Sequence, residues 1–145
     1  MTEIAAKGRA ELLAGLRDGR WEMRRASALE LMRAPDAADL PRLAALLHDP
    51  KVAVRHAVVV VIAVAHGRGR EAEVVPLLVE RALTDESLRV RRQAVSMLAW
   101  QLAHPDLEGF FAQVAESESD ERLVRFARVG RHLARERAKR EGAPC

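Results

Sequence analysis

Three aspartate–arginine pairs with the same spacing are the most regular chemical feature of the sequence. They are Asp18 with Arg24, Asp49 with Arg55, and Asp85 with Arg91, and the two members are six residues apart in each pair. A carboxylate beside a guanidinium is suited to acid–base chemistry, but a catalytic site is usually a single constellation. Three regular copies therefore argue against a catalytic centre and favour a structural role.

Other residues with catalytic or ligand-binding chemistry lack the spacing that such sites need. The five histidines include no pair four residues apart, and no HExxH motif accompanies them; they are His48, His56, His66, His104 and His132. No GxSxG motif is present. The loop HGRGRE, residues 66–71, lacks the spacing of a phosphate-binding loop and predicts a flexible connection. We expect no enzymatic activity, no metal and no cofactor.

Length and composition predict one helical domain. A chain of 145 residues can bury a core without a disulfide or metal. Hydrophobic residues make up 49% of it and aromatic residues 3%, so the core consists of Ala, Val and Leu, as in helical bundles and solenoids. The single cysteine, Cys145, favours a reducing compartment. The first 13 residues, MTEIAAKGRAELL, lack the apolar core of a signal peptide. We expect a soluble, cytoplasmic protein that does not enter membranes.

The charge is unevenly distributed along the chain. Its formal net value is only +3, yet eight basic residues and one acidic residue lie between Arg122 and Arg140, a net charge of +7. Such a segment is suited to an acidic partner, whereas a solvated terminal helix is the simpler interpretation.

The chain repeats itself four times. Residues 18–32, 49–63 and 85–99 align without gaps, and residues 119–133 join them with Ser119 in place of aspartate. The arginines Arg24, Arg55, Arg91 and Arg125 are then 31, 36 and 34 residues apart, and each follows an apolar residue. A second amphipathic segment lies upstream of each block, with apolar residues at helical spacing. Each repeat therefore predicts a helical hairpin.

The segment HAVVVVIAVAH, residues 56–66, permits three interpretations. Its β-branched run suggests a strand, and its apolarity suggests a membrane span. The apolar stretch covers only 14 residues, 52–65, and is interrupted by Arg55 and His56, whereas about 20 residues are needed to cross a bilayer. Because burial of a valine outweighs its small helix penalty, the alignment predicts a buried helix.

The repeated pattern is an aspartate in a short turn, followed by "VR" at the start of a second helix. This pattern resembles the HEAT repeat family, particularly its short bacterial members. The resemblance runs from about Ile4 to Lys139. It implies an all-α fold, a right-handed α-solenoid of about four HEAT-like helical hairpins. The expected domain is residues 1–141, with repeats at about 1–34, 35–66, 67–104 and 105–141 and a tail at 142–145. Arg128 and His132 occupy apolar positions of the last repeat, as a polar solenoid cap requires.

The resemblance also implies roles for two sets of residues. In the family, aspartates and arginines at the turns form a ladder that ties neighbouring repeats, and second helices line the concave surface. The expected ladder consists of Asp18, Arg24, Asp49, Arg55, Asp85, Arg91 and Arg125. Positions −1, 4, 7 and 8 from each "VR" arginine are mostly apolar and predict the core. The remaining positions predict a groove with an apolar floor of Val60, Val64, Met97 and Trp100, a rim of Arg25, Arg33, Arg92 and Arg131, and His56 beside it.

Alternatives remain open for these residues. A short, tightly curved stack would instead bury the floor residues against one another. Trp21 lies in the first turn, where tubulin-binding HEAT arrays place a tryptophan that contacts the partner; we favour a role for it in covering the open end of the core.

The functional prediction is a non-catalytic scaffold that binds a protein or peptide on its concave surface. The alternative is a nucleic-acid-binding HEAT-like protein of the DNA-repair type, supported by the arginine rows and the pI of 9.7 but opposed by few lysines and aromatics. Chromophore or lyase accessory proteins with similar repeats are a weaker third class. The open ends of the stack also predict self-association into a homo-oligomer.

Overall fold

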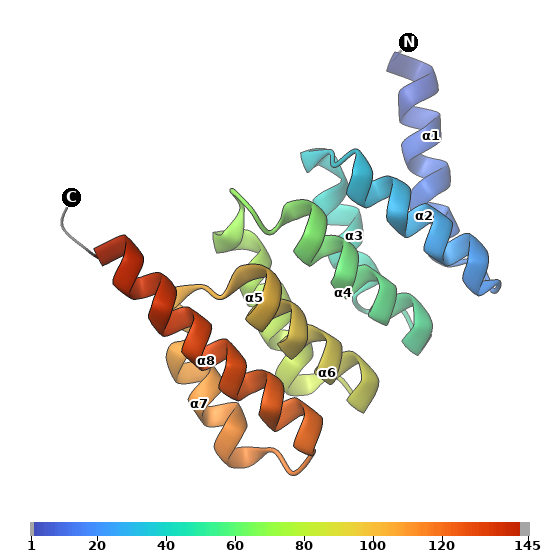
Figure 1. Ribbon diagram of the computed structural model, residues 1–145. Helices are drawn as coiled ribbons and strands as arrows, with labels where there is room; N and C mark the ends of the chain where they lie inside the picture. Colours follow the sequence, from blue (N-terminus) through green and yellow to red (C-terminus); the bar gives the residue numbers. More distant parts are fainter. Residues whose placement is uncertain (1, 143–145) are drawn as a thin grey trace.

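The computed structural model describes the backbone of residues 2–142 and the side chains of residues 8–142. Cys145 lies outside the described residues. Within them the chain is helical and contains no strand, which confirms the all-α prediction (Figure 1). The helices are α1 (Thr2–Gly15), α2 (Trp21–Arg33), α3 (Leu40–Leu46), α4 (Val52–His66), α5 (Glu71–Thr84), α6 (Leu88–Met97), α7 (Glu108–Ser117) and α8 (Glu121–Gly142). Short helical turns adjoin three of these helices. η1 (Ala37–Asp39) precedes α3, η2 (Leu98–Leu102) extends α6, and η3 (Pro105–Leu107) precedes α7.

The helices pack as pairs in chain order. Each odd-numbered helix packs on the even-numbered helix that follows it, and the even-numbered helices pack successively from α2 to α8. Figure 1 shows α2, α4, α6 and α8 side by side in one row, with α3, α5 and α7 behind them. This arrangement contains the four predicted helical hairpins.

The valine-rich helix α4 lies at the centre of the core. Val58, Val59, Val61 and Ile62 are fully buried there, because α2, α3, α5 and α6 all pack around α4. Burial of each side chain stabilises the fold by about 1.5–3 kcal/mol, which exceeds the modest helix penalty of valine. The prediction of a buried helix is confirmed. No helix among the described residues combines the length and apolarity needed to span a bilayer.

The predicted core positions are buried in the two middle repeats and less so at the ends. Val54, Ala63, Val90 and Ala99 are buried as expected. Met23, at the corresponding position of α2, is exposed instead, so its assignment to the core is wrong. The reason is that α2 packs mainly on α1 and α4, whereas α4 packs on α2, α3, α5 and α6.

In the structure, the fourth repeat is shifted by one residue from the alignment that the sequence predicts. Arg24, Arg55 and Arg91 are each the fourth residue of their helix, whereas Arg125 is the fifth residue of α8. Burial supports this shift, because the third residue is the buried one in α4, α6 and α8 (Val54, Val90 and Leu123). Segment 118–132 therefore corresponds to the earlier repeats, and Glu118 takes the position of the aspartate.

Candidate interaction surface

The six-residue spacing places each arginine on the backbone of its own turn. Nη1 of the arginine donates a hydrogen bond to the carbonyl oxygen of the aspartate, over 2.8 Å from Arg24 to Asp18, 2.8 Å from Arg55 to Asp49 and 3.0 Å from Arg91 to Asp85. The aspartate carboxylate instead accepts the backbone N–H two residues later, over 2.9 Å in all three turns. The arginine six residues later therefore binds the backbone of the turn and not the carboxylate of its own aspartate. Other arginines of the same repeat reach that carboxylate in two turns, Arg20 to Asp18 over 3.0 Å and Arg81 to Asp85 over 3.3 Å.

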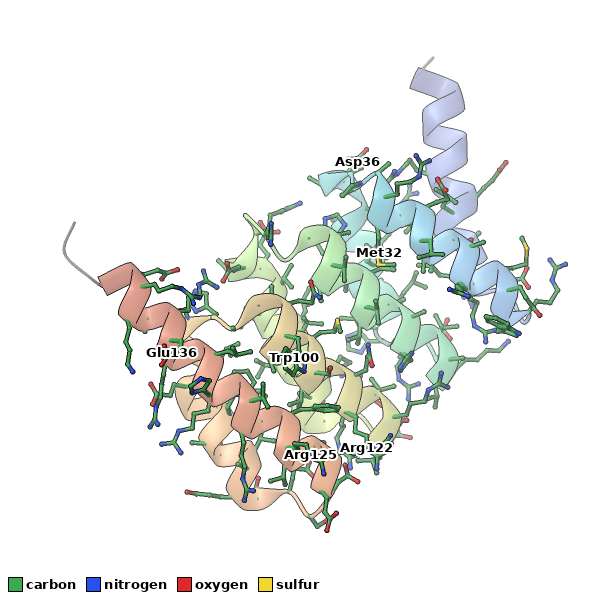
Figure 2. All side chains as sticks on the ribbon, viewed as in Figure 1. Met32, Asp36, Trp100, Arg122, Arg125 and Glu136 are labelled. Atoms are coloured by element: carbon green, nitrogen blue, oxygen red, sulfur yellow. The ribbon has the colours of Figure 1, made fainter. Side chains whose placement is uncertain are left out.

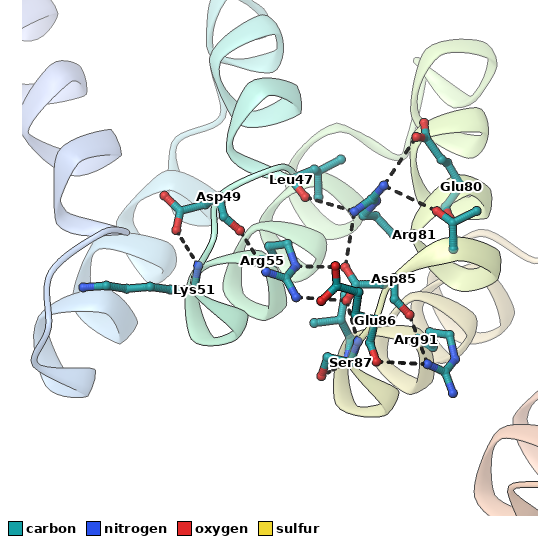
Figure 3. A network of polar contacts seen from close by, with 12 residues as sticks. Leu47, Asp49, Lys51, Arg55, Glu80, Arg81, Asp85, Glu86, Ser87 and Arg91 are labelled. Atoms are coloured by element: carbon teal, nitrogen blue, oxygen red, sulfur yellow. Dashed lines mark hydrogen bonds and ion pairs between the residues drawn. The ribbon is translucent and has the colours of Figure 1, made fainter.

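The most buried ion pair between repeats among the described residues joins Arg55 of α4 to Asp85 (Figure 3). Nε and Nη2 of Arg55 donate to the two carboxylate oxygens over 2.9 and 3.1 Å. The side chains are nearly buried, with exposed fractions of 11% and 0%. Burial alone would raise the pKa of Asp85, but hydrogen bonds from Arg55 and from the N–H of Ser87 bring that pKa below its ordinary value. The carboxylate is therefore ionised at neutral pH.

The other rungs of the ladder differ from the prediction. Arg17, not Arg24, reaches the carboxylate of Asp49, over 3.0 Å. Arg91 lies 3.7 Å from Glu118, the residue that replaces aspartate in the fourth turn. Arg125 makes no ion pair among the described residues. The ladder thus joins successive repeats, but Arg24 and Arg125 do not take part in its inter-repeat contacts.

Exposed apolar side chains lie on the row of even-numbered helices. We call the outward surface of α2, α4, α6 and α8 the even-helix face. Val64 and Trp100 are each the thirteenth residue from the start of their helical segment, and their exposed fractions are 42% and 56%. Figure 2 shows Trp100 between the ribbons of α6 and α8 in this row. Val60, Met97 and His56 are partly buried. The middle of the face therefore carries an exposed indole beside apolar side chains.

A wide helical turn holds Trp100 in place. It belongs to η2, a π-helical turn that ends α6. The N–H of Ala103 donates to the carbonyl of Leu98 over 2.8 Å, and Ala103 adopts left-handed backbone dihedrals, φ 43° and ψ 40°. Leu98, Ala99 and Leu102 of this turn are buried, so the turn is anchored and directs Trp100 outward.

The four arginines of the predicted rim have different environments in the structure. Arg33 pairs with Glu30 over 2.6 Å, and Arg92 pairs with Asp120 over 2.8 Å. Arg25 is exposed and has no ion pair among the described residues. Arg131 is the eleventh residue of α8, and the eleventh residues of the other even-numbered helices, Leu31, Ile62 and Leu98, are buried. Arg131 therefore lies away from the even-helix face.

Two features of the surface differ from the sequence-based expectations. Leu29 of α2 is exposed and lies at the same helix position as Val60, so it extends the apolar surface. Its alignment with Val60 was the signal that could have identified it. Trp21, the first residue of α2, has an exposed fraction of 57%, so the interpretation that it covers the core is wrong. The reason is that α2 packs mainly on α1 and α4, which leave the side chain of its first residue exposed.

A cleft of about 430 Å³ between α1 and α3 was not expected from the sequence. Leu13 and Leu46 form its apolar floor, and Arg42 and His48 lie at its edge. No group of three histidine, cysteine, aspartate or glutamate side chains in the described part of the chain is arranged to hold a metal ion.

One buried histidine, His66, and one partly buried histidine, His56, predict that acid destabilises the fold. Burial lowers the pKa of His56 and of His66 below the ordinary value of about 6.5. The unfolded chain therefore takes up protons first as pH falls, so stability present above about pH 6.5 is lost below it. We expect a lower free energy of unfolding at pH 5.5 than at pH 7.5, measured by urea denaturation. His66→Gln should reduce this difference.

The exposed His48 provides the control for that measurement. His48→Gln should leave the pH dependence between pH 7.5 and 5.5 as it is in the parent protein. Equal stability of the parent at pH 7.5 and 5.5 would contradict the expectation for the histidines.

A second loss of stability is expected below about pH 4, because hydrogen bonds from Arg92 and Arg20 hold the pKa values of Asp120 and Asp18 at about 2.

Comparison of the chain with protein-family models, with curated proteins and with solved structures found no match. The described residues themselves offer a row of four packed helices, a ladder of ion pairs at the turns, and a surface with an exposed tryptophan at its centre.

Proposed function

We propose that the chain is a HEAT-like α-solenoid that acts as a non-catalytic scaffold and binds a protein or peptide on its even-helix face. The observation that carries the proposal is the exposure of Trp100, 56%, in the middle of a row of helices whose other sides are buried. Tryptophan is enriched among the residues that dominate binding energy at protein interfaces. An indole that is exposed and also held by an anchored turn is suited to that role.

The surroundings of Trp100 support a preformed site. Val64 lies at the same position of the neighbouring helix α4, and Met97 lies one turn before Trp100 on α6. Because α4 and α6 are packed into the core, these side chains need little ordering when a partner binds. Arg25 supplies an exposed charge on α2 without an acidic neighbour, as expected at the polar edge of an interface.

The proposal is tested with Trp100→Ala and Val64→Ser. A partner captured from the source cell and purified should bind each variant more weakly than the parent, at least about 30-fold for Trp100→Ala if the indole contributes about 2 kcal/mol or more. Surface substitutions change stability by about 0.5 kcal/mol or less, so the free energy of unfolding should remain near that of the parent.

Leu83→Ala provides the matched control. Leu83 is similarly exposed but lies on α5, behind the row of even-numbered helices, so binding should not change. A large loss of stability in Trp100→Ala with unchanged affinity would show that the indole is a structural residue and would contradict the proposal. The same measurement on Trp21→Ala decides whether the first turn also contacts the partner.

A further inference from the structure

The outer side of α8 has basic residues where the other even-numbered helices have core residues. The eighth, eleventh and twelfth positions of α8 are Arg128, Arg131 and His132, and all three are exposed. The same positions are apolar in α2, α4 and α6: Ala28, Leu31 and Met32; Val59, Ile62 and Ala63; and Val95, Leu98 and Ala99. Most of these are buried against neighbouring helices. We call Arg125, Arg128, Arg131 and His132 the outer face of α8.

The charges of this face are not neutralised within the protein. None of its four residues forms a hydrogen bond or ion pair among residues 8–142. Other arginines of α8 do: Arg135 pairs with Glu108, and Arg137 pairs with Glu71 over 3.0 Å. Nearby acidic groups on α8 are Glu121 at its start and Glu136, which pairs with Lys139 over 3.2 Å. The centre of the free positive charge is therefore at Arg128 and Arg131.

Capping alone does not require this composition. The last helix of a stack needs a polar outer side, which acidic and basic residues of mixed sign provide equally well. Residues 122–142 contain eight basic and two acidic residues, a net +6, whereas residues 1–121 contain sixteen basic and nineteen acidic residues, a net −3. The general preference for arginine in this chain therefore does not account for the local excess of positive charge.

We infer that the outer face of α8 binds the phosphate backbone of double-stranded nucleic acid without sequence preference. Phosphate contacts need only correctly spaced cations, and arginine presents a planar fork of donors that matches phosphate. Arg125, Arg128 and His132 follow one another at three and four residues, so they lie about 5–6 Å apart along one side of the helix.

The other anionic partners match this face less well. A protein interface usually has an apolar core, and an amphipathic helix that binds membranes needs an apolar face. Beside Arg125 and Arg128 the apolar side chain is that of Val124, which is partly buried, so this face has no exposed apolar core. Single-stranded nucleic acid is held partly by stacking on aromatic side chains, and none is present among the four residues of the outer face. A duplex backbone is the partner that requires only the positive charges that are present.

The experiment is binding of the full chain to fluorescent 20-base-pair DNA duplexes of two unrelated sequences, measured by anisotropy between about 50 and 200 mM salt. Both duplexes should bind with equal affinity. The logarithm of the association constant should fall with the logarithm of salt concentration with a slope of about −2.5 to −3, as expected for phosphate contacts from the three arginines. Arg128→Glu/Arg131→Glu should weaken binding at 50 mM salt by more than about tenfold and reduce the slope by about 2.

Arg42→Glu/Arg68→Glu is the matched control, because both residues are exposed, lie outside α8 and give the same change in net charge. It should weaken binding by less than about threefold. Equal losses in both double variants, or no binding of the parent at 50 mM salt, would overturn the inference. Binding of a polyglutamate peptide in preference to the duplex would also overturn it, in favour of an acidic protein. Trp100→Ala should leave duplex binding unchanged, so this inference and the proposed function can fail independently.

Discussion

Asp85→Ala is expected to lower the free energy of unfolding by about 3–5 kcal/mol, the usual cost of removing one partner from a buried ion pair. Arg55 would keep its charge in a nearly buried position without the two carboxylate oxygens that it now contacts over 2.9 and 3.1 Å. Arg81, which also lies 3.3 Å from the same carboxylate, would lose a partner as well. Urea denaturation at pH 7.5 measures the effect.

Two further variants identify the origin of that loss. Asp106→Ala removes an aspartate whose side chain is 92% exposed, so its effect should stay within about 0.5 kcal/mol. Arg55→Leu combined with Asp85→Leu removes both charges and should be less destabilising than the sum of the single variants, with a coupling of at least about 1 kcal/mol. Additive losses in the pair, or a loss below about 1 kcal/mol for Asp85→Ala, would contradict the assignment.

Gly130→Ala is expected to destabilise the protein by about 1–3 kcal/mol, although alanine is normally the better helix residue. A Cβ atom at Gly130 would lie 2.6 Å from two atoms of the Phe111 ring. Phe111 is fully buried on α7, so the ring cannot move away without disturbing the contact between α7 and α8. Thermal or urea unfolding of the variant measures this cost.

Gly109→Ala is the control because Gly109 lies on α7 and an added Cβ atom there would have no neighbouring atom within 4 Å. At that position the usual helix preference should act alone and raise stability by about 0.5–1 kcal/mol. Opposite signs for the two glycine variants are therefore expected. A stabilising Gly130→Ala would show that Phe111 has more freedom than its burial indicates.

Much of the helical organisation could be predicted from the sequence because the repeats constrain one another. The valine run of α4 has no clear helical signal of its own, and only its alignment with residues 18–32 and 85–99 made a helix the better interpretation. The physical reason is that burial between neighbouring repeats decides its conformation, and the alignment records that environment. Isolated propensity does not contain this information.

The register of the fourth repeat could not be predicted in the same way. The alignment places Ser119 at the position of the aspartate, whereas in the structure Glu118 lies 3.7 Å from Arg91. A shift of one residue rotates each position by about 100° around the helix. Because of this rotation, Arg131 lies on the outer face of α8 and not at the predicted rim of the even-helix face.

The ion-pair partners of several charged residues also could not be predicted from the sequence. The spacing of Asp85 and Arg91 is regular, yet the carboxylate of Asp85 pairs with Arg55, 30 residues earlier. Arg92 likewise pairs with Asp120, 28 residues later, which reduces its availability. Such pairings depend on how adjacent hairpins stack, which the spacing within one repeat does not determine.

The unequal rungs of the ladder have a consequence for cooperativity. Arg17, in the first rung, has a side chain that is 63% exposed, whereas Arg55 in the second is 11% exposed. Water and salt therefore weaken the first link far more than the second. In the proposed solenoid, where each hairpin would be stabilised only by its neighbours, we expect the first hairpin to detach before the two middle hairpins separate.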